Sequence, residues 1–212
     1  MTKRKDQIAE LVGAIRQRFN GQRLIVCLAG APGSGKSTMA EKLVDALNAD
    51  QPGLAMLLPM DGYHFDDIVL EQLGRKARKG ASDTFDVGGL DSILKRLRDG
   101  SEEVVAVPVF DRSIEIARAG ARLIPRSTKL IVVEGNYLLL DAEPWRRLRQ
   151  HFDFSVFIDV PEATLRERLM CRWRDLNYSE QAALEKVDGN DLPNARIVTS
   201  QSSEPDLRVS GT

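Results

Sequence analysis

The sequence predicts an α/β fold in which a mainly parallel sheet lies between two layers of helices. Short apolar runs typical of buried strands alternate along the chain with segments whose apolar residues recur at helical spacing. A glycine-rich turn connects the first of these runs to a helix. The 212 residues are 42% hydrophobic and 29% charged, which is the balance of one ordinary folded domain.

The first half of the chain alternates helices and strands as such a fold requires. Residues 6–20 carry apolar side chains at helical spacing and are expected to form an amphipathic helix. Residues 23–29 are apolar and rich in branched side chains, which predicts a strand buried on both faces. A helix over residues 36–47 and a strand over residues 54–60 follow. Together, the two strands and the helix predict a parallel βαβ unit.

The middle of the chain predicts a further helix and two strands. Apolar residues at helical spacing over residues 90–97 predict a helix that ends at Asp99-Gly100. Residues 104–110 and 130–133 are strand candidates, and the segment between them, residues 114–124, can form a hairpin.

The last third predicts a strand over residues 156–158, after which Asp159 and Pro161 open a helix that runs to about Leu176. The core stripe of this helix is expected to consist of Leu165, Leu169, Trp173 and Leu176. Residues 201–212 are polar and are expected to be loosely held.

Charge and apolar patterning exclude several classes of protein. Thirty Lys and Arg residues against 31 Asp and Glu give a net charge of −1, so no global field attracts nucleic acid or an acidic membrane. The apolar runs are far shorter than the roughly 20 residues that span a bilayer. Cys27 and Cys171 cannot form a disulfide framework and lack metal-ligand spacing. We therefore expect a cytoplasmic protein with no nucleic acid or membrane partner.

The glycine-rich turn is a complete GxxxxGK[ST] phosphate-binding loop, or P-loop. Glycines let successive backbone N–H groups turn inward around phosphates. Lys36 is expected to reach the β- and γ-phosphates of ATP, and the Ser37 hydroxyl to bind Mg²⁺. The expected nucleotide-binding residues are Gly30, Ala31, Pro32, Gly33, Ser34, Gly35, Lys36, Ser37 and Thr38.

Two acidic residues follow predicted strands and are candidates for chemistry. Asp61 stands at the carboxyl end of the second strand, where ligands of open α/β sheets bind. A carboxylate there can take the proton from an attacking hydroxyl, although Asp61-Gly62 is equally a turn signal. Glu134 ends an apolar strand, the expected place for a carboxylate that holds Mg²⁺, and a solvated strand-end acid is the alternative.

The helix after Pro161 carries Arg166, Arg168, Arg172 and Arg174. Arg168 and Arg172 are four residues apart and are therefore expected to project together. A closing lid that brings guanidinium groups to a triphosphate would use this pattern. The alternative is a solvated face paired with the acidic residues Glu162, Glu167 and Asp175.

The P-loop by itself does not separate a kinase from other nucleotide-binding proteins. The chain lacks an Asn-Lys-x-Asp segment of the kind that reads guanine in switch GTPases. The 212 residues show no second nucleotide domain, so a helicase or transporter motor is not expected. A regulatory or chaperone-like ATPase that binds a protein partner stays open, as does a nucleotide-binding structural subunit without turnover. The presence of both acids, Asp61 and Glu134, counts against the structural subunit.

Taken in order, these motifs resemble the superfamily of uridine kinase, phosphoribulokinase and bacterial pantothenate kinase. The closer resemblance is to a subgroup of nucleoside/nucleotide kinase-like proteins that includes kinases assigned to fructose transport systems. It extends over residues 20–198. The segments that carry it are Asp61–Phe65, Arg78–Asp86, Pro108–Ser113, Glu134–Leu140, Arg172-Trp173 and Asn190–Ala195.

This resemblance implies a single P-loop kinase domain over residues 1–212, with a core at about 20–198, a lid at about 162–190 and an acceptor-side insertion at about 62–89. It implies that Asp61 is the base on the acceptor side and that Asn194 contacts adenine, although a turn-forming Asn is the alternative. The implied acceptor pocket consists of Asp61, Tyr63, His64, Arg78, Lys79, Asp83, Phe85, Asp86, Asp111, Arg112, Asn136 and Tyr137.

These residue types suit a polyol or a phosphorylated polyol, because carboxylates and amides hold hydroxyls, aromatic rings pack on sugars and basic groups bind a phosphate. Structural roles stay open for several residues: a surface histidine at His64, core side chains at Phe85 and Phe110, and a solvated basic face at residues 75–79. Two departures separate the chain from typical uridine kinases. Gly62 and Tyr63 follow the Asp, where uridine kinases have Ser and an aromatic residue, and the lid lacks an Arg-Gly-rich segment.

The sequence therefore predicts an ATP- and Mg²⁺-dependent kinase that transfers the γ-phosphate to a hydroxyl of a sugar, sugar phosphate or nucleoside-like small molecule. The alternative is the partner-binding ATPase. The expected catalytic residues are Lys36, Asp61, Arg168 and Arg172, with Ser37 and Glu134 at the metal, and Arg172 also on the nucleotide. A homodimer is common among similar kinases, and the sequence leaves the oligomeric state open.

Overall fold

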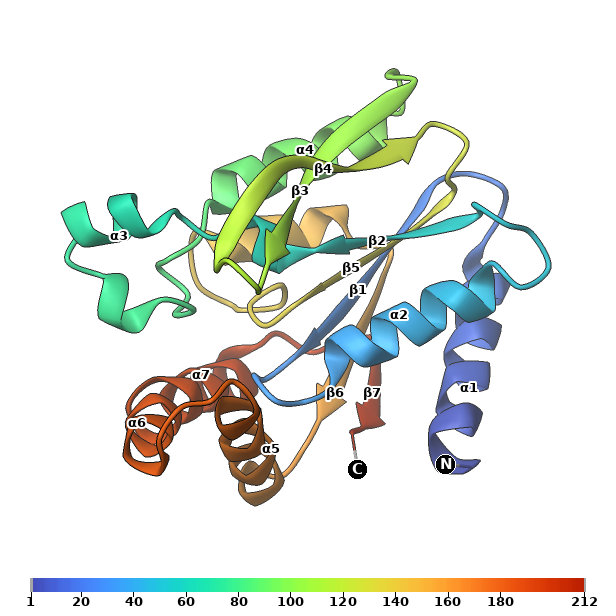
Figure 1. Ribbon diagram of the computed structural model, residues 1–212. Coiled ribbons are helices and arrows are strands. Elements are labelled where there is room, and N and C mark those ends of the chain that lie inside the picture. Colours follow the sequence, from blue (N-terminus) through green and yellow to red (C-terminus); the bar gives the residue numbers. More distant parts are fainter. Residues whose placement is uncertain (1, 212) are drawn as a thin grey trace.

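A five-stranded parallel sheet forms the centre of the molecule (Figure 1). The structure is a computed structural model that describes residues 2–211, with side chains from residue 6 onward. Helices cover both faces of the sheet, so the predicted three-layer α/β fold is confirmed. In spatial order the strands are β2 (Ala55–Pro59), β5 (Leu130–Gly135), β1 (Leu24–Gly30), β6 (Phe154–Asp159) and β7 (Leu207–Ser210).

The helices form three groups around this sheet (Figure 1). The first group packs on one face, the second lies on the opposite face, and the third stands beside the carboxyl ends of the strands. They are α1 (Thr2–Arg18) with α2 (Lys36–Leu47), then α4 (Val87–Asp99) with the 3₁₀ helix η3 (Trp145–His151), then α5 (Glu162–Asp175), α6 (Glu180–Lys186) and α7 (Leu192–Gln201). Shorter elements are η1 (Met60–Tyr63), α3 (Asp67–Gln72), η2 (Lys76–Arg78) and the π-helical turn η4 (Val187–Asp191).

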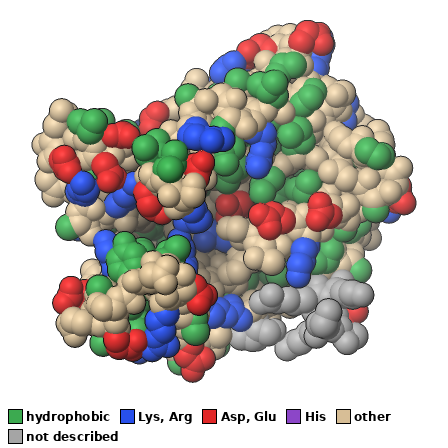
Figure 2. Space-filling view, in the orientation of Figure 1, with side chains coloured by type: hydrophobic (Ala, Val, Ile, Leu, Met, Phe, Trp, Pro, Cys, Tyr) green, Lys and Arg blue, Asp and Glu red, His purple; other side chains and the backbone are tan. Residues whose placement is uncertain are grey.

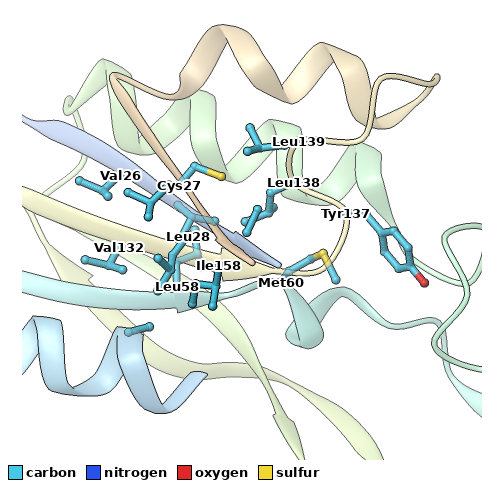
Figure 3. Close-up of a cluster of buried hydrophobic side chains, with 14 of the residues drawn as sticks. Val26, Cys27, Leu28, Leu58, Met60, Val132, Tyr137, Leu138, Leu139 and Ile158 are labelled. Atoms are coloured by element: carbon cyan, nitrogen blue, oxygen red, sulfur yellow. The ribbon is translucent and has the colours of Figure 1, made fainter. Parts of the chain in front are cut away.

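The core explains why the strand sequences lack alternation. Every residue of β1 and β5 is buried, because helices lie on both faces of these central strands. Val26 and Leu28 of β1 pack beside Val132 of β5 and Leu58 of β2 (Figure 3). This packing fixes the carboxyl ends of the strands, and with them the loops that carry the polar site.

The prediction for residues 114–124 is wrong in its pairing. The segment is not a hairpin by itself but most of one strand, β4 (Ile116–Pro125), which pairs antiparallel with β3 (Val104–Asp111). These two strands form a sheet separate from the parallel one. The turn between them contains Glu115 at φ 55°, a left-handed conformation. Cross-strand pairs along the whole length of β3 and β4 stabilise both strands. Such pairing is not visible in the pattern of either segment alone.

The expectation of a loosely held tail is also wrong for the described residues. β7 pairs parallel with β6, and the side chain of Gln7 donates a 2.7 Å hydrogen bond to the Ser210 carbonyl oxygen. A Cβ at Gly211 would lie 2.3 Å from the Val160 side chain, so the chain is tightly packed there. Thr212 lies outside the described residues. A four-residue strand with one buried side chain leaves almost no pattern in a sequence.

The four predicted helices are present as α1, α2, α4 and α5, and α2 agrees residue for residue, whereas α3, α6 and α7 were not predicted. The core stripe of α5 is confirmed at Leu165 and Leu169, whereas Trp173 is only partly buried and Leu176 is 47% exposed at the mouth of a cavity. Within residues 2–211, none of the helices combines the length and the apolar character that crossing a bilayer demands.

Candidate active site

A cavity of about 770 Å³ opens at the carboxyl ends of β1, β2 and β5. We call it the central cavity. Its walls come from the P-loop, the insertion (residues 62–89), the β3–β4 hairpin and the lid (residues 162–190), with α7 behind the lid. In the space-filling view it is the hollow between the part that carries α3 and the part that carries α5 to α7, with Lys and Arg side chains inside (Figure 2).

The P-loop connects β1 to α2 in a conformation that needs glycine. Gly33 and Gly35 have φ values of 80° and 85°, in the left-handed region. A Cβ at Gly33 would also come within 3.1 Å of Leu169, and one at Gly30 within 2.8 Å of the Ser34 hydroxyl oxygen. The loop is therefore shaped both by its own turns and by the lid helix packed against it.

Lys36 is the first residue of α2 and lines the central cavity. Burial lowers the pKa of its ammonium group, and the negative charges of Glu134 and Asp61 oppose that shift. Among the described residues, no carboxylate makes an ion pair with it. The Ser34 hydroxyl in the same loop is buried and lacks a hydrogen-bond partner among the described residues. A partly buried cation without a carboxylate partner, at the start of a helix that follows a glycine-rich turn, fits a phosphate group.

Glu134 lies in β5, directly beside β1, and is 4% exposed. The Ser37 hydroxyl donates a 3.1 Å hydrogen bond to its carboxylate. Burial raises the pKa of Glu134, while the charge of Lys36 and the bond from Ser37 act against that rise. One hydroxyl and one carboxylate in contact are hard oxygen donors of the kind that Mg²⁺ takes together with water and phosphate. Within the described residues, no three His, Cys, Asp or Glu side chains gather as an all-protein metal site.

Asp61 lies in η1, just past the end of β2, and lines the central cavity. Arg112, which follows β3, donates a 2.6 Å hydrogen bond from Nη2 to Asp61 Oδ2. Burial opposes the charge on Asp61, but His64, Arg112, Lys36 and Arg172 outweigh it and hold its pKa below the ordinary value. The carboxylate is therefore ionised and able to accept a proton in the cavity at neutral pH.

His64 is held between two phenylalanine rings, with ring centroids 4.1 Å from Phe85 and 4.8 Å from Phe110. Its Nδ1 lies 2.8 Å from the backbone carbonyl oxygen of Asp61. Because a carbonyl oxygen only accepts, Nδ1 carries the proton and Nε2 keeps a free lone pair in the neutral ring. Burial lowers the pKa of His64, although Asp61 opposes the shift, so the neutral ring prevails at pH 7.

The two lid arginines four residues apart do not share a target. Arg168 donates from Nη2 to the Gly211 carbonyl oxygen at 2.8 Å, and its Nη1 is 3.4 Å from the carbonyl oxygens of Gly33 and Ser34. It does not line the central cavity, whereas Arg172 does. Arg168 thus connects the back of the P-loop to the end of the chain, and Arg172 points its charge toward the site.

The turn η4 and the start of α7 add polar groups that motif reasoning did not assign. The Trp173 indole donates a 2.6 Å hydrogen bond to Asp191 Oδ2. Burial raises the pKa of Asp191, against the hydrogen bond from Trp173 and the charge of Arg172. Asn190 donates to the Lys79 carbonyl oxygen at 3.1 Å and so connects the lid to the insertion. π-Helical turns within helices are frequent at functional sites. The turn at Val187–Asp191 would therefore have pointed to these residues, but the sequence pattern does not predict it.

Asn194, predicted at the adenine base, is 6% exposed and lines the same cavity as Asp61. Its amide donates a 3.1 Å hydrogen bond to the Asn190 side chain. Asn136 also lines the cavity, and its buried Oδ1 lacks a donor among the described residues.

The predicted acceptor-pocket residues divide into two groups. Asp61, His64, Lys79, Phe85, Arg112 and Asn136 line the central cavity together. The others lie near it but contact protein: Asp86 caps α4 through Gly89, Asp83 pairs with Arg75 and Arg78, Asp111 accepts from Ser113, and Tyr137 donates to Gly80. Tyr63 is buried, and its hydroxyl lacks a partner among the described residues.

Comparisons with known proteins identify the family and support the fold. The model of the Phosphoribulokinase / Uridine kinase family matches residues 25–178. A crystal structure of a "putative fructose transport system kinase" from Silicibacter sp. TM1040 is 41% identical, covers 95% of this chain and 98% of that one, and superposes with a TM-score of 0.89.

Several curated relatives carry kinase names, among them the following two. A "putative uridine kinase" of Schizosaccharomyces pombe is 31% identical over 88% of this chain and 82% of its own length. The pantothenate kinase of Enterococcus faecalis is 30% identical over 76% of this chain and 56% of its own length.

Proposed function

The chain belongs to the Phosphoribulokinase / Uridine kinase family, as the order of its motifs predicts, and we propose that it phosphorylates a hydroxyl group of a sugar, sugar phosphate or nucleoside-like acceptor with ATP and Mg²⁺. Membership makes it a P-loop small-molecule kinase. The observation that carries the proposal is the position of Asp61, an ionised carboxylate that shares one cavity with Lys36 and Arg172.

In the proposed reaction Asp61 acts on the acceptor, and Lys36 and Arg172 act on the phosphates. An acceptor hydroxyl attacks the γ-phosphorus of ATP, its oxygen forms the new P–O bond, and the bond from phosphorus to the β-phosphate oxygen breaks, leaving ADP. The hydroxyl proton passes to the Asp61 carboxylate. Lys36 and Arg172 balance the charge on the transferred group. Positioning and electrostatics therefore carry the rate.

Ser37 and Glu134 fit a magnesium ion, because their oxygens already lie 3.1 Å apart at the mouth of the P-loop. A Mg²⁺ ion held by Ser37 and Glu134 would neutralise part of the phosphate charge. Glu134 then keeps its negative charge, which burial alone disfavours.

The proposal is tested first by ATP consumption with Mg²⁺ against sugars, sugar phosphates, nucleosides and vitamins, beside a control without acceptor. One compound that multiplies turnover and is recovered phosphorylated supports it. Steady hydrolysis that no small molecule changes would contradict it and favour a partner-binding ATPase.

Asp61→Asn tests the base directly. We expect kcat to fall by about 10²- to 10⁴-fold with little change in ATP affinity, because the amide keeps the shape but accepts no proton. Asp66→Asn is the matched control, since Asp66 only caps α3 through Ile68 and Asn caps equally well. Wild-type turnover in Asp61→Asn would remove Asp61 from the mechanism.

A further inference from the structure

The charged side chains of the central cavity are arranged differently on its two sides. We call the insertion and hairpin the acceptor wall, and the P-loop and lid the nucleotide wall. Each wall contributes three cationic side chains to the lining. Those of the acceptor wall are Lys76, Lys79 and Arg112, and those of the nucleotide wall are Lys36, Arg172 and Lys186.

Each cation of the acceptor wall already has a carboxylate partner. Lys79 Nζ lies 2.7 Å from Asp67 Oδ1 and 2.8 Å from the Glu115 carbonyl oxygen. Lys76 pairs with Glu71 and lies 3.6 Å from Asp67. Arg112 pairs with Asp61 at 2.6 Å.

The acidic side chains of this wall balance its cations. Asp61, Asp67 and Glu115 line it, so three carboxylates face three cations. The Glu115 carboxylate makes no ion pair within the described part of the chain. The acceptor wall therefore offers no uncommitted positive charge.

The cations of the nucleotide wall, in contrast, have no carboxylate partners among the residues that the structure describes. Across residues 6–211, neither Lys36, Arg172 nor Lys186 makes an ion pair with a carboxylate. Arg172 and Lys186 each lie 5.9 Å from the centre of the Trp173 ring. Asp191, the carboxylate beside them, is held by the Trp173 indole. Because these three cations have no carboxylate partner within residues 6–211, they are available to bind the triphosphate of ATP, and we assign them to it.

Two polar atoms of the acceptor wall, one on His64 and one on Asp61, are free to accept hydrogen bonds. His64 presents the Nε2 lone pair, because its Nδ1 is committed to a carbonyl oxygen. Asp61 uses Oδ2 for Arg112 and keeps Oδ1. Atoms of this kind are satisfied by O–H or N–H donors of a ligand, and a phosphate or carboxylate brings none when ionised.

From this charge arrangement we propose that the acceptor is an uncharged polyhydroxylated molecule, a free sugar or the ribose of a nucleoside, and that sugar phosphates and hydroxy acids are rejected. The inference rests on the proposed kinase activity and narrows its substrate. Several hydroxyl donors satisfy Asp61 Oδ1 and His64 Nε2 at once, and the rings of His64, Phe85 and Phe110 give the C–H face of a sugar a surface to pack on.

An anionic acceptor would have to break an existing ion pair. If its anion took Lys79, Asp67 would lose its close partner and the Glu115 carbonyl oxygen its donor. Repulsion from the unpaired Glu115 carboxylate adds to this cost. Discrimination against such acceptors thus comes from charges already placed in the wall.

The experiment compares matched pairs of acceptors with Mg²⁺ and ATP: a free hexose and its 6-phosphate, a free pentose and its 5-phosphate, and glycerol and glycerate. We expect kcat/KM at least about tenfold higher for the uncharged member of the pairs that react. A nucleoside measured beside the free pentose separates the two sources of the polyol. Preference for the anionic members overturns the inference and leaves the kinase intact, whereas a flat panel overturns the proposed function and the inference with it.

Asp67→Asn tests the mechanism of rejection. It frees Lys79 and weakens the hold on Lys76, so we expect the ratio of kcat/KM for the anionic over the uncharged member to rise by about tenfold. Asp66→Asn, one residue away and without an ion pair to Lys79, leaves the ratio unchanged. Because the ratio is internal to each variant, loss of active protein cancels. An unchanged ratio in Asp67→Asn contradicts the inference.

Discussion

The two walls of the central cavity use similar side chains in opposite electrostatic states. On the nucleotide wall the partly buried Lys36 and the exposed Arg172 have no carboxylate partner among the described residues, and desolvation in the cavity lowers the pKa of both. On the acceptor wall Lys79 and Arg112 are fixed by Asp67 and Asp61. A cation that is partly desolvated and has no carboxylate partner is stabilised by a bound anion, so we expect phosphate to bind at this wall. Paired charge costs less and serves to orient neighbouring groups.

The largest effect that would sharpen this comparison is expected at Arg172. Arg172→Gln removes an unpaired cation of the nucleotide wall, and we expect kcat to fall by about 10²-fold. Arg168→Gln, four residues earlier on the same helix, removes bonds to the P-loop and Gly211 carbonyl oxygens instead. We expect it to raise KM for ATP and lower the melting temperature, with less effect on kcat.

Steady-state kinetics and thermal unfolding of both variants decide the matter. If Arg168→Gln lost as much kcat as Arg172→Gln while folding normally, the two arginines would act together, as helical spacing alone predicts.

The position of the P-loop could be predicted from sequence, whereas Lys186 of the nucleotide wall was not predicted and the acceptor wall was predicted only in outline. The P-loop is one continuous turn, so its place between β1 and α2 follows from eight adjacent positions, while the roles of its residues stay predictions. The acceptor wall is assembled from the insertion and the hairpin, which lie far apart in the chain. Motif resemblance pointed to Arg78 and Asp83, which pair with each other, and did not assign Asp67.

The same distinction holds for the fold. Buried parallel strands and α2 carry strong local patterns, so β1 and β5 were predictable. β4 and β7 are held by partners distant in sequence, and their own residues are mostly exposed, so no period marks them. Arg168 is an example of what sequence patterns cannot predict. Helical spacing predicts the helix face on which it lies, but not its hydrogen bond to the carbonyl oxygen of Gly211, which is 43 residues away in the chain.

A smaller effect is expected at Arg112, whose charge on the acceptor wall is paired. Arg112→Gln removes one of the positive charges that hold the pKa of Asp61 down, so that pKa rises. The ionised carboxylate is the active form and is lost as pH falls through its pKa. The acid side of the pH profile of kcat/KM should therefore move to higher pH, with only a modest loss at neutral pH.

Arg118→Gln is the matched control for that profile, because Arg118 pairs with Asp111, which does not line the cavity. Its acid limb should coincide with that of the wild type. If the acid limb of Arg112→Gln does not move, then either Asp61 is not the group that accepts the proton or Arg112 does not lower the pKa of Asp61.

The smallest effect tests to which wall Asn194 belongs. The resemblance assigns it to adenine, yet its amide binds Asn190, which in turn donates to Lys79 in the insertion. Asn194→Ala removes one neutral hydrogen bond from this connection, so we expect KM for the acceptor to rise by about three- to tenfold while KM for ATP is unchanged. A rise in KM for ATP alone would return Asn194 to the nucleotide wall. The result depends on which KM changes, that for the acceptor or that for ATP. It therefore assigns Asn194 to one wall even if the variant loses part of its total activity.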